Sequence, residues 1–236
     1  MMRVAVHGTG RMAQAVVNAA ADTADARVIA LCGRSAPEWE TGIPRADALE
    51  NMPEIPDLLV DFTLPEGTHT AALWCASAGV PLVSGVTGLS TEAQSALRRA
   101  ARVVPVLWAA NLSLGVNLLA ELAARAAAVL GDSVPVDIED VHHQWKKDAP
   151  SGTALALGDA IGAERGSAEG IAYHSVREGE VVGDHRVVFH LVGEDIELGH
   201  SARDRSIFAA GALKAGQWLL SQPPGFYSAR DWLRGG

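Results

Sequence analysis

Two histidines, two lysines and an aspartate crowd one short polar segment of the chain. Residues 142–154 read His-His-Gln-Trp-Lys-Lys-Asp-Ala-Pro-Ser-Gly-Thr-Ala. A histidine can donate or accept a proton near neutral pH, and a lysine offers a compact cation for a carboxylate. Residues 150–153 should begin a helix, whose first N–H groups attract anions. The segment therefore predicts an anion pocket with a proton donor at its edge.

Each of these residues alone has an ordinary structural interpretation. A single histidine is usually structural or simply exposed, and neighbouring lysines usually form a solvated face. No simple requirement of the fold asks for the whole combination. A metal site is the weaker interpretation, because adjacent histidines chelate poorly and Glu139 and Asp140 fall on a predicted strand rather than at ligand spacing. We therefore expect no metal.

A glycine turn near the N-terminus suits a nucleotide. Gly8-x-Gly10-x-x-Ala13 joins a β-branched run, residues 3–7, to an alanine-rich helix. Glycines at such a turn let backbone N–H groups approach a pyrophosphate at the positive end of the helix. Strand-to-helix turns also use glycine for purely steric reasons, so the motif alone is weak. Its place at the start of a strand–helix–strand series favours a dinucleotide.

The end of the second predicted strand bears on the choice of cofactor. It reads Cys32-Gly33-Arg34-Ser35, with no carboxylate before Glu38. Domains selective for NAD place an acid there, whereas an arginine fork can pair with a 2′-phosphate. Arg34, helped by Arg11, therefore predicts NADPH over NADH, unless Arg34 is only a solvated loop residue.

The elements that must position these residues fall into two groups. Short apolar strands alternate with helices up to Asn111, which predicts a parallel sheet covered on both faces. Loops after its strands, residues 61–63, 85–88 and 109–112, should converge with the glycine turn on one crevice. A helix over residues 114–130 then leads into an α+β region with an open, largely antiparallel sheet. A final apolar helix, residues 207–220, should pack on the first group.

Composition narrows the functional class. The 236 residues are 48% hydrophobic and 20% charged, an ordinary globular balance, and the net charge of −9 argues against nucleic acid as a partner. The most apolar run, residues 118–130, is interrupted by Glu121 and Arg125, so we expect no membrane span. The N-terminus lacks the pattern of a signal peptide, and Cys32 and Cys75 suit buried thiols. We expect a cytoplasmic protein.

The polar segment also carries a resemblance. His142-His143-x-x-Lys146 followed by residues 148–154 resembles the signature of the dihydrodipicolinate reductase family, and similarity extends along the whole chain. It implies a Rossmann-like cofactor domain, residues 1–112 with 207–236. It also implies a central α+β domain, residues 113–206, which binds substrate and assembles a homotetramer through its mixed sheet. The implied activity is NAD(P)H-dependent reduction of a small dicarboxylate, 4-hydroxy-2,3,4,5-tetrahydrodipicolinate, in lysine (diaminopimelate) biosynthesis.

The resemblance also implies roles for single residues. His142 and Lys146 would be the catalytic acids, in a polar loop, and His143, Gly152 and Thr153 would hold the dicarboxylate. The residues that would line the cofactor, NADPH by preference with NADH as the alternative, are Gly8, Thr9, Gly10, Arg11, Met12, Arg34, Gly85, Val86, Thr87, Ala109, Ala110, Asn111 and Leu112.

One of the last predicted strands is rich in apolar residues. These residues predict a sheet face apolar enough to pack against a second copy: Val187, Val188, Phe189, Leu191 and Val192.

Two other functions are the alternatives. Another Rossmann dehydrogenase of amino-acid metabolism, such as aspartate or homoserine dehydrogenase, would not need the histidine–lysine segment. A non-catalytic NADP(H) sensor would have no use for its lysine and histidines.

Overall fold

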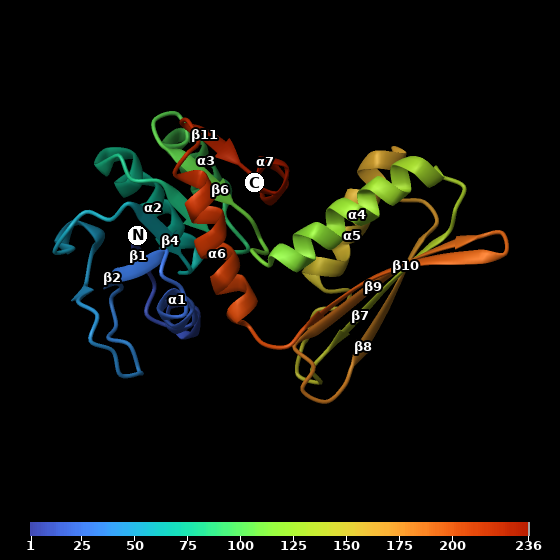
Figure 1. Cartoon of the computed structure of the whole chain (residues 1–236), viewed down its shortest axis with the longest axis horizontal. Coiled ribbons are helices and arrows are strands. Elements are labelled where there is room, and N and C mark those ends of the chain that lie inside the picture. Colours follow the sequence, from blue (N-terminus) through green and yellow to red (C-terminus); the bar gives the residue numbers. More distant parts are fainter. Residues whose placement is uncertain (236) are drawn as a thin grey trace. The chain divides into compact units, whose positions relative to one another are not determined.

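In the computed structural model, which describes residues 1–235, the chain divides into two units (Figure 1). One comprises Met1–Ser113 and the segment from Ser206 onward, and the other comprises Leu114–Arg205. Within the described part of the chain, no helix combines the length and the apolar character that a bilayer crossing requires.

The first unit is built on a seven-stranded parallel sheet in the order β11-β6-β5-β4-β1-β2-β3. Its central strands are almost wholly buried, as expected where helices cover both faces. The strands are β1 (Met2–His7), β2 (Ala26–Cys32), β3 (Arg45–Ala46), β4 (Leu58–Asp61), β5 (Leu82–Ser84), β6 (Pro105–Trp108) and β11 (Gly225–Tyr227). The helices are α1 (Arg11–Ala21), the short 3-10 helix η1 (Leu49–Asn51), α2 (Pro65–Ala78), α3 (Thr91–Ala100), α6 (Ser206–Leu219) and α7 (Ala229–Gly235).

Two apolar cores hold the helices against this sheet. Helices α1, α6 and α7 contribute to the core on one face, and α2 and α3 to the core on the other. The chain starts at β1, runs outward through β2 and β3, and returns to the other side of β1 at β4. Ligands of doubly wound sheets bind at the carboxyl ends of the strands at such a reversal. The fold therefore favours a site between the ends of β1 and β4.

The second unit has a four-stranded mixed sheet in the order β10-β9-β7-β8. Strand β8 pairs parallel with β7, while β7 with β9 and β9 with β10 are antiparallel. Two helices pack on one face of it, where Ile138, Val187 and Phe189 form the core with residues of both helices. The elements are α4 (Leu114–Leu130), β7 (Val136–His142), α5 (Gly152–Arg165), β8 (Ile171–Arg177), β9 (Gly183–Leu191) and β10 (Glu194–Ala202).

The outer face of this sheet corrects one expectation. Val187 and Phe189 point to the helices and not to an open face, because alternate residues of a strand face opposite sides. The other side carries charged side chains: Arg186 contacts Glu139 and Glu197 across three strands. His190 lies 3.2 Å from Asp137 and 2.9 Å from Asp195. The prediction of a broadly apolar outer face is wrong.

Candidate active site

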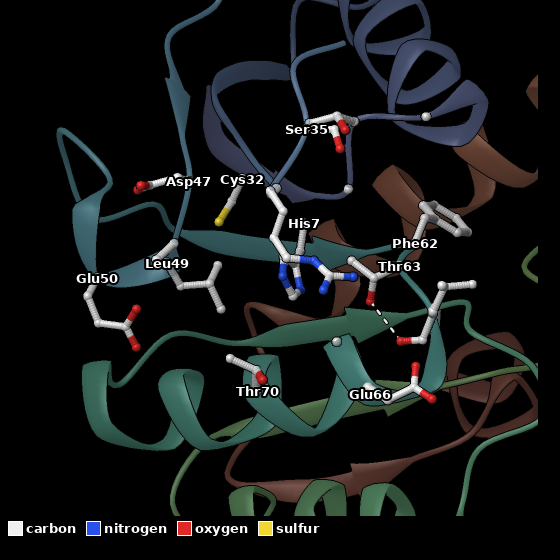
Figure 2. Close-up of a pocket in the computed structure, with 18 residues that line it drawn as sticks. His7, Cys32, Ser35, Asp47, Leu49, Glu50, Phe62, Thr63, Glu66 and Thr70 are labelled. Atoms are coloured by element: carbon white, nitrogen blue, oxygen red, sulfur yellow. Dashed lines mark hydrogen bonds between the residues drawn. The ribbon is translucent and has the colours of Figure 1, made fainter. Parts of the chain in front are cut away.

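A pocket of about 750 Å³ lies at the carboxyl edge of the parallel sheet (Figure 2). The loops after β1, β2 and β4 line it with residues 7–10, 32–35 and 62–64, and the segment 47–50 and helix α2 complete it. These loops come from neighbouring strands, so they converge where the strand order reverses. The pocket therefore coincides with the position expected for a nucleotide.

The glycine turn in this pocket fits a pyrophosphate. Gly8 has a φ of +127°, a region that favours glycine, and a Cβ there would lie 3.2 Å from the carbonyl oxygen of Phe62. Helix α1 follows this turn. Its N-cap residue, Gly10, has no side chain that could cap the first N–H groups of the helix, and the first turn of the helix contains no acidic residue. A phosphate oxygen can approach this backbone closely and accept hydrogen bonds from the helix terminus. These residues fit a dinucleotide.

A buried carboxylate ties together the strand ends around the pocket. Asp61 is fully buried and accepts hydrogen bonds from Thr63 (2.7 Å), Thr68 (2.7 Å) and Ser84 (3.0 Å). Its Oδ1 lies 3.4 Å from Nδ1 of His7, which lines the pocket. Burial by itself would raise the pKa of Asp61, but His7 and the threonine hydroxyls outweigh it, and the pKa is lowered. The network fixes the ends of β1, β4 and β5.

The predicted cofactor residues divide into two sets. Gly8, Thr9, Gly10 and Arg34 line the pocket. The remaining nine do not line it, although a Cβ on Gly85 would meet Phe62 and Leu112, so the predicted loops at 85 and 112 pack around a pocket residue. Those nine are Arg11, Met12, Gly85, Val86, Thr87, Ala109, Ala110, Asn111 and Leu112.

Carboxylates in the pocket were not foreseen. Asp47, Glu50 and Glu66 line it together with Arg34. Asp47 and Glu50 precede and enter η1, which lies in a segment without clear periodicity, so the sequence did not place them at the end of β2. Their charges oppose that of Arg34 in any preference for a 2′-phosphate.

The polar segment belongs to the second unit, where one face of the sheet changes character along its length. Toward the start of β7, the helix-covered face carries the apolar Val136 and Ile138. The next two residues of that face are Asp140 and His142, which are 1% and 8% exposed. Pairing of β7 with β8 and β9 adds Ser175, Arg177 and His185 beside them. The alternation of β7 therefore places Asp140 and His142 on the same buried face as Val136 and Ile138, so a buried polar cluster lies next to the apolar core.

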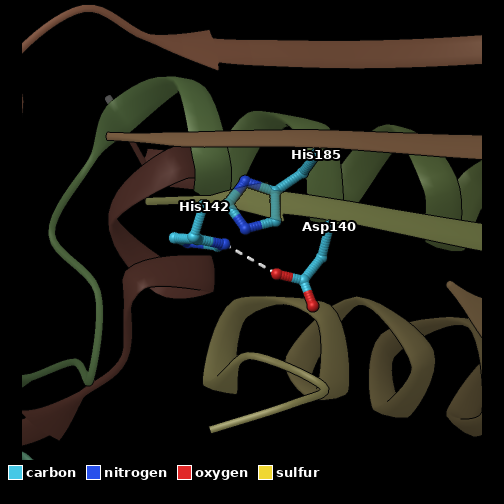
Figure 3. A group of neighbouring side chains, drawn as sticks. All are labelled: Asp140, His142 and His185. Carbon is cyan, nitrogen blue, oxygen red and sulfur yellow. Dashed lines mark ion pairs between the residues drawn. The ribbon is translucent and has the colours of Figure 1, made fainter. Parts of the chain in front are cut away.

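Asp140 is the centre of this cluster. It accepts hydrogen bonds from the backbone N–H of Ser151 (3.0 Å), the hydroxyl of Ser175 (2.7 Å) and the guanidinium of Arg177 (3.1 and 3.3 Å). Nδ1 of His142 lies 2.7 Å from its Oδ1 (Figure 3). Burial alone would raise the pKa of Asp140, but these donors outweigh it and lower the pKa to about 2. Asp140 is therefore ionised near neutral pH.

Three histidines on the same face favour their neutral forms. Burial lowers the pKa of His142, and the charges of Lys146 and Arg177 lower it further, although Asp140 opposes them. Burial and His142 lower the pKa of His185 to about 4, and burial lowers that of His200. The ring of His185 contacts the other two: it meets His142 edge-on with centroids 5.2 Å apart, and it is tilted against His200 with centroids 6.2 Å apart. An anion bound here would favour protonation of these rings.

The loop after β7 supplies the predicted lysine. Nζ of Lys146 lies 2.7 Å from Asp148, and the backbone N–H of Lys146 bonds to the carbonyl of His143 (3.0 Å). Arg177 donates to the carbonyl of Asp148 (2.6 Å) and so ties this loop to β8. The expectation that His142 lies in the loop with Lys146 is wrong: His142 is the last residue of β7 and is buried. The structure nevertheless brings the two within electrostatic reach.

Helix α5 starts beside the cluster. Ser151 is its N-cap and accepts a hydrogen bond from the N–H of Ala154, so Gly152 and Thr153 form its first turn. That turn contains no acid of its own, and the carboxylate of Asp140 accepts a hydrogen bond from the N–H of Ser151 beside it. The ring of His143 lies 5.9 Å from that of Trp145 in the preceding loop. The predicted substrate residues thus all belong to the stretch between β7 and the start of α5.

Asp140, His142 and His185 offer one potential metal ligand each, with the ligand atoms within 4.8 Å of one another. The carboxylate of Asp140 already accepts hydrogen bonds from the guanidinium of Arg177 and from Ser151 and Ser175. A cation would have to displace or lie beside this positive charge. The geometry therefore favours an ion-paired acid–base cluster.

Comparison with known proteins decides the family. Residues 2–112 match the family model described as dihydrodipicolinate reductase, N-terminus, and residues 115–233 match the model described as dihydrodipicolinate reductase, C-terminus. The chain belongs to the dihydrodipicolinate reductase family. A 4-hydroxy-tetrahydrodipicolinate reductase of Stenotrophomonas maltophilia (strain R551-3) is 46% identical over 99% of this chain and 98% of its own. One of Xanthomonas campestris pv. campestris (strain B100) is 43% identical over 98% and 97%. The chain is an oxidoreductase of a family that uses a nicotinamide cofactor.

Solved structures agree with the fold. The dipicolinate-bound dihydrodipicolinate reductase from Paenisporosarcina sp. TG-14 superposes with a TM-score of 0.86 at 24% identity, over 98% of both chains. A diaminopimelate dehydrogenase of C. glutamicum gives a TM-score of 0.61 at 12% identity, over 96% of this chain and 92% of its own. A parallel sheet with flanking helices and a separate mixed sheet are therefore confirmed as the architecture.

Proposed function

We propose that this chain reduces 4-hydroxy-2,3,4,5-tetrahydrodipicolinate to 2,3,4,5-tetrahydrodipicolinate in lysine (diaminopimelate) biosynthesis. Membership of the family and the names of its relatives support the reaction. The observation that carries the site is the juxtaposition of His142 and Lys146 next to the start of α5. The unit from Leu114 to Arg205 would bind the dicarboxylate, and the unit with the glycine turn would bind the cofactor.

The residues divide the work as follows. Loss of the hydroxyl group together with a hydrogen of the adjacent ring carbon, as water, leaves a carbon–carbon double bond conjugated with the ring imine. A bound reduced nicotinamide would supply hydride to the electrophilic end of this double bond. Lys146 and His142 would supply the proton to the carbon next to it. His143 and the first turn of α5, Gly152 and Thr153, hold a ring carboxylate. Positioning and charge complementarity provide most of the rate enhancement.

A coupled assay tests the reaction directly. Aspartate semialdehyde and pyruvate, with the synthase that condenses them, generate the substrate in place, and NADPH absorbance follows its reduction. Consumption of NADPH that depends on all three components is the expected result. Binding of NADPH without such consumption would favour a sensor instead, and turnover of homoserine would favour another dehydrogenase.

The cofactor preference rests on Arg34. Its guanidinium can form charge-assisted hydrogen bonds with a 2′-phosphate, so Arg34→Ala should lower the NADPH-to-NADH ratio of kcat/KM by about tenfold or more. Asp47→Asn should change the ratio in the opposite direction, because it removes a negative charge from the same pocket. Arg27→Ala, an exposed arginine of β2 outside the pocket, is the control. A wild-type preference for NADH, or an unchanged ratio in Arg34→Ala, would contradict the assignment.

The oligomer is expected to be a homotetramer that forms through the outer face of the mixed sheet. Both helices of that unit pack on the other face, and the outer face presents the charged residues Arg186, Glu139 and Glu197, which can pair with a second copy. Light scattering at micromolar concentration should give about four times the 24.7 kDa of one chain. Arg186→Glu should lower that mass by placing like charges together. A monomeric wild type would contradict the proposal.

The enzyme is expected to work in the cytoplasm. Cys32 and Cys75 are both free and buried, and burial raises the pKa of each thiol, so neither is suited to pairing or to reaction.

A further inference from the structure

Asp140 lies beside His142, although the proposed reaction gives Asp140 no role of its own. Asp140 and His142 are two positions apart on β7, so their side chains lie on the same face of the sheet. The carboxylate of Asp140 is held from three directions, by Ser151 at the start of α5 and by Ser175 and Arg177 on β8. It is therefore a rigid acceptor, and Nδ1 of His142 lies 2.7 Å from it (Figure 3).

A rigid, ionised carboxylate at this distance determines where the imidazole carries its proton. A bare Nδ1 would place its lone pair 2.7 Å from the negative charge of this carboxylate, so the contact favours the neutral ring with its proton on Nδ1. Nε2 is then the nitrogen that can exchange a proton. It lies against Gly183 of β9, where a Cβ would be 3.0 Å away, so the absence of a side chain there leaves room for the ring.

We propose that Asp140 is a positioning residue for His142: it holds Nδ1 protonated and presents Nε2 as the proton-donating nitrogen. The inference rests on the proposed function, in which His142 is a catalytic acid. Asp140 does not touch the reacting atoms in this scheme. It also stabilises the imidazolium, because its negative charge lies beside Nδ1.

Several other groups act on the same ring. Besides burial, the charges of Lys146 from the loop and Arg177 of β8 lower the pKa of His142, and Asp140 raises it. His185 of β9 packs against the same ring, and its own pKa is lowered by burial and by His142. Loss of the charge of Asp140 should therefore move the protonation of His142 to lower pH.

Asp140→Asn removes the charge with almost no change in shape. We expect kcat to fall on the order of 100-fold, while the affinities for NADPH and for dipicolinate stay nearly unchanged. The limb of the pH–rate profile that belongs to His142 should move to lower pH. Asp137→Asn is the matched control, because Asp137 is also a carboxylate of β7 that pairs with a histidine, His190 of β9, but on the outer face of the sheet. It should leave kcat and the profile as in the wild type.

The tautomer of His142 can be measured directly in the wild-type protein. Nitrogen-15 shifts of the two ring nitrogens, assigned by comparison with His142→Gln, should show protonated Nδ1 in the wild type and loss of that tautomer in Asp140→Asn. A wild type with protonated Nε2 and bare Nδ1 would overturn the proposal, as would an Asp140→Asn variant with unchanged kcat and unchanged tautomer. If the wild type does not reduce the substrate, the proposed function fails, but the tautomer still decides the role of Asp140.

Discussion

Lys146→Ala and His142→Gln are each expected to lower kcat by about 10²–10⁴-fold, the usual contribution of a general acid. The side chain of Lys146 is 21% exposed and its ammonium contacts Asp148 rather than the core, so its removal leaves no cavity. His142 is buried, and glutamine fills most of its volume while it removes the titrating ring. Steady-state kinetics with NADPH and the coupled substrate measure the effect, and quenching of protein fluorescence measures NADPH binding separately.

The neighbour of Lys146 is the control for this experiment. Lys147 carries the same charge and is exposed, so Lys147→Ala should leave kcat close to that of the wild type. A loss in both lysine variants would indicate general attraction of the dianion rather than proton transfer. Turnover by Lys146→Ala at nearly the wild-type rate would remove it from the mechanism.

Much of the architecture could be predicted because it follows from periodicity. Helix α4 has the predicted bounds, and the ends of β1 and α6 differ from the predicted ranges by at most one residue. β11 and α7 were not predicted, because three residues of strand and one short helix carry too little pattern. The interpretation of the outer face failed for another reason. Val187 and Phe189 stand two apart and therefore face the same side, so apolar density along a strand does not show which face is open.

The site was predictable where its residues are close in sequence. His142, His143, Lys146, Gly152 and Thr153 lie within one short stretch, and their types alone suggested an acid beside an anion. Their partners could not be read in the same way. Ser175 and Arg177 lie 35 and 37 residues after Asp140, and only the register of β7 with β8 brings them together. One signal was present: β7 alternates Val136, Ile138, Asp140 and His142 on its buried face, and a buried carboxylate requires donors.

Arg177 is the partner whose loss should affect stability most. Its guanidinium contacts both oxygens of Asp140, its own side chain is 16% exposed, and that of Asp140 is 1% exposed. Arg177→Ala would leave a buried carboxylate without its countercharge. Removal of one member of a buried pair typically costs about 3–5 kcal/mol in the free energy of unfolding. The variant also loses the bond to the carbonyl of Asp148, which anchors the loop of Lys146.

The comparison with Arg3→Ala separates burial from charge. Arg3 also contacts two carboxylates, Glu54 and Asp57, but its side chain is 42% exposed, and pairs in water contribute about 0–1 kcal/mol. Urea unfolding at pH 7 should therefore show a much larger loss for Arg177→Ala than for Arg3→Ala. Equal losses in the two variants would show that the buried ion pair contributes no more to the free energy of unfolding than an exposed one.

The loss of stability in Arg177→Ala should depend on pH. In the wild type the pKa of Asp140 is about 2, below the 3.8 of an unperturbed carboxyl, so its ionised form stabilises the fold above pH 3.8. That stabilisation is lost as the pH falls from 3.8 through 2. Without Arg177 the pKa of Asp140 should rise, since burial then dominates. The stability difference between wild type and Arg177→Ala should thus be full at pH 7 and shrink as the medium becomes acidic. A difference that stays constant down to the acid transition would mean that Arg177 acts through packing and not through the charge of Asp140.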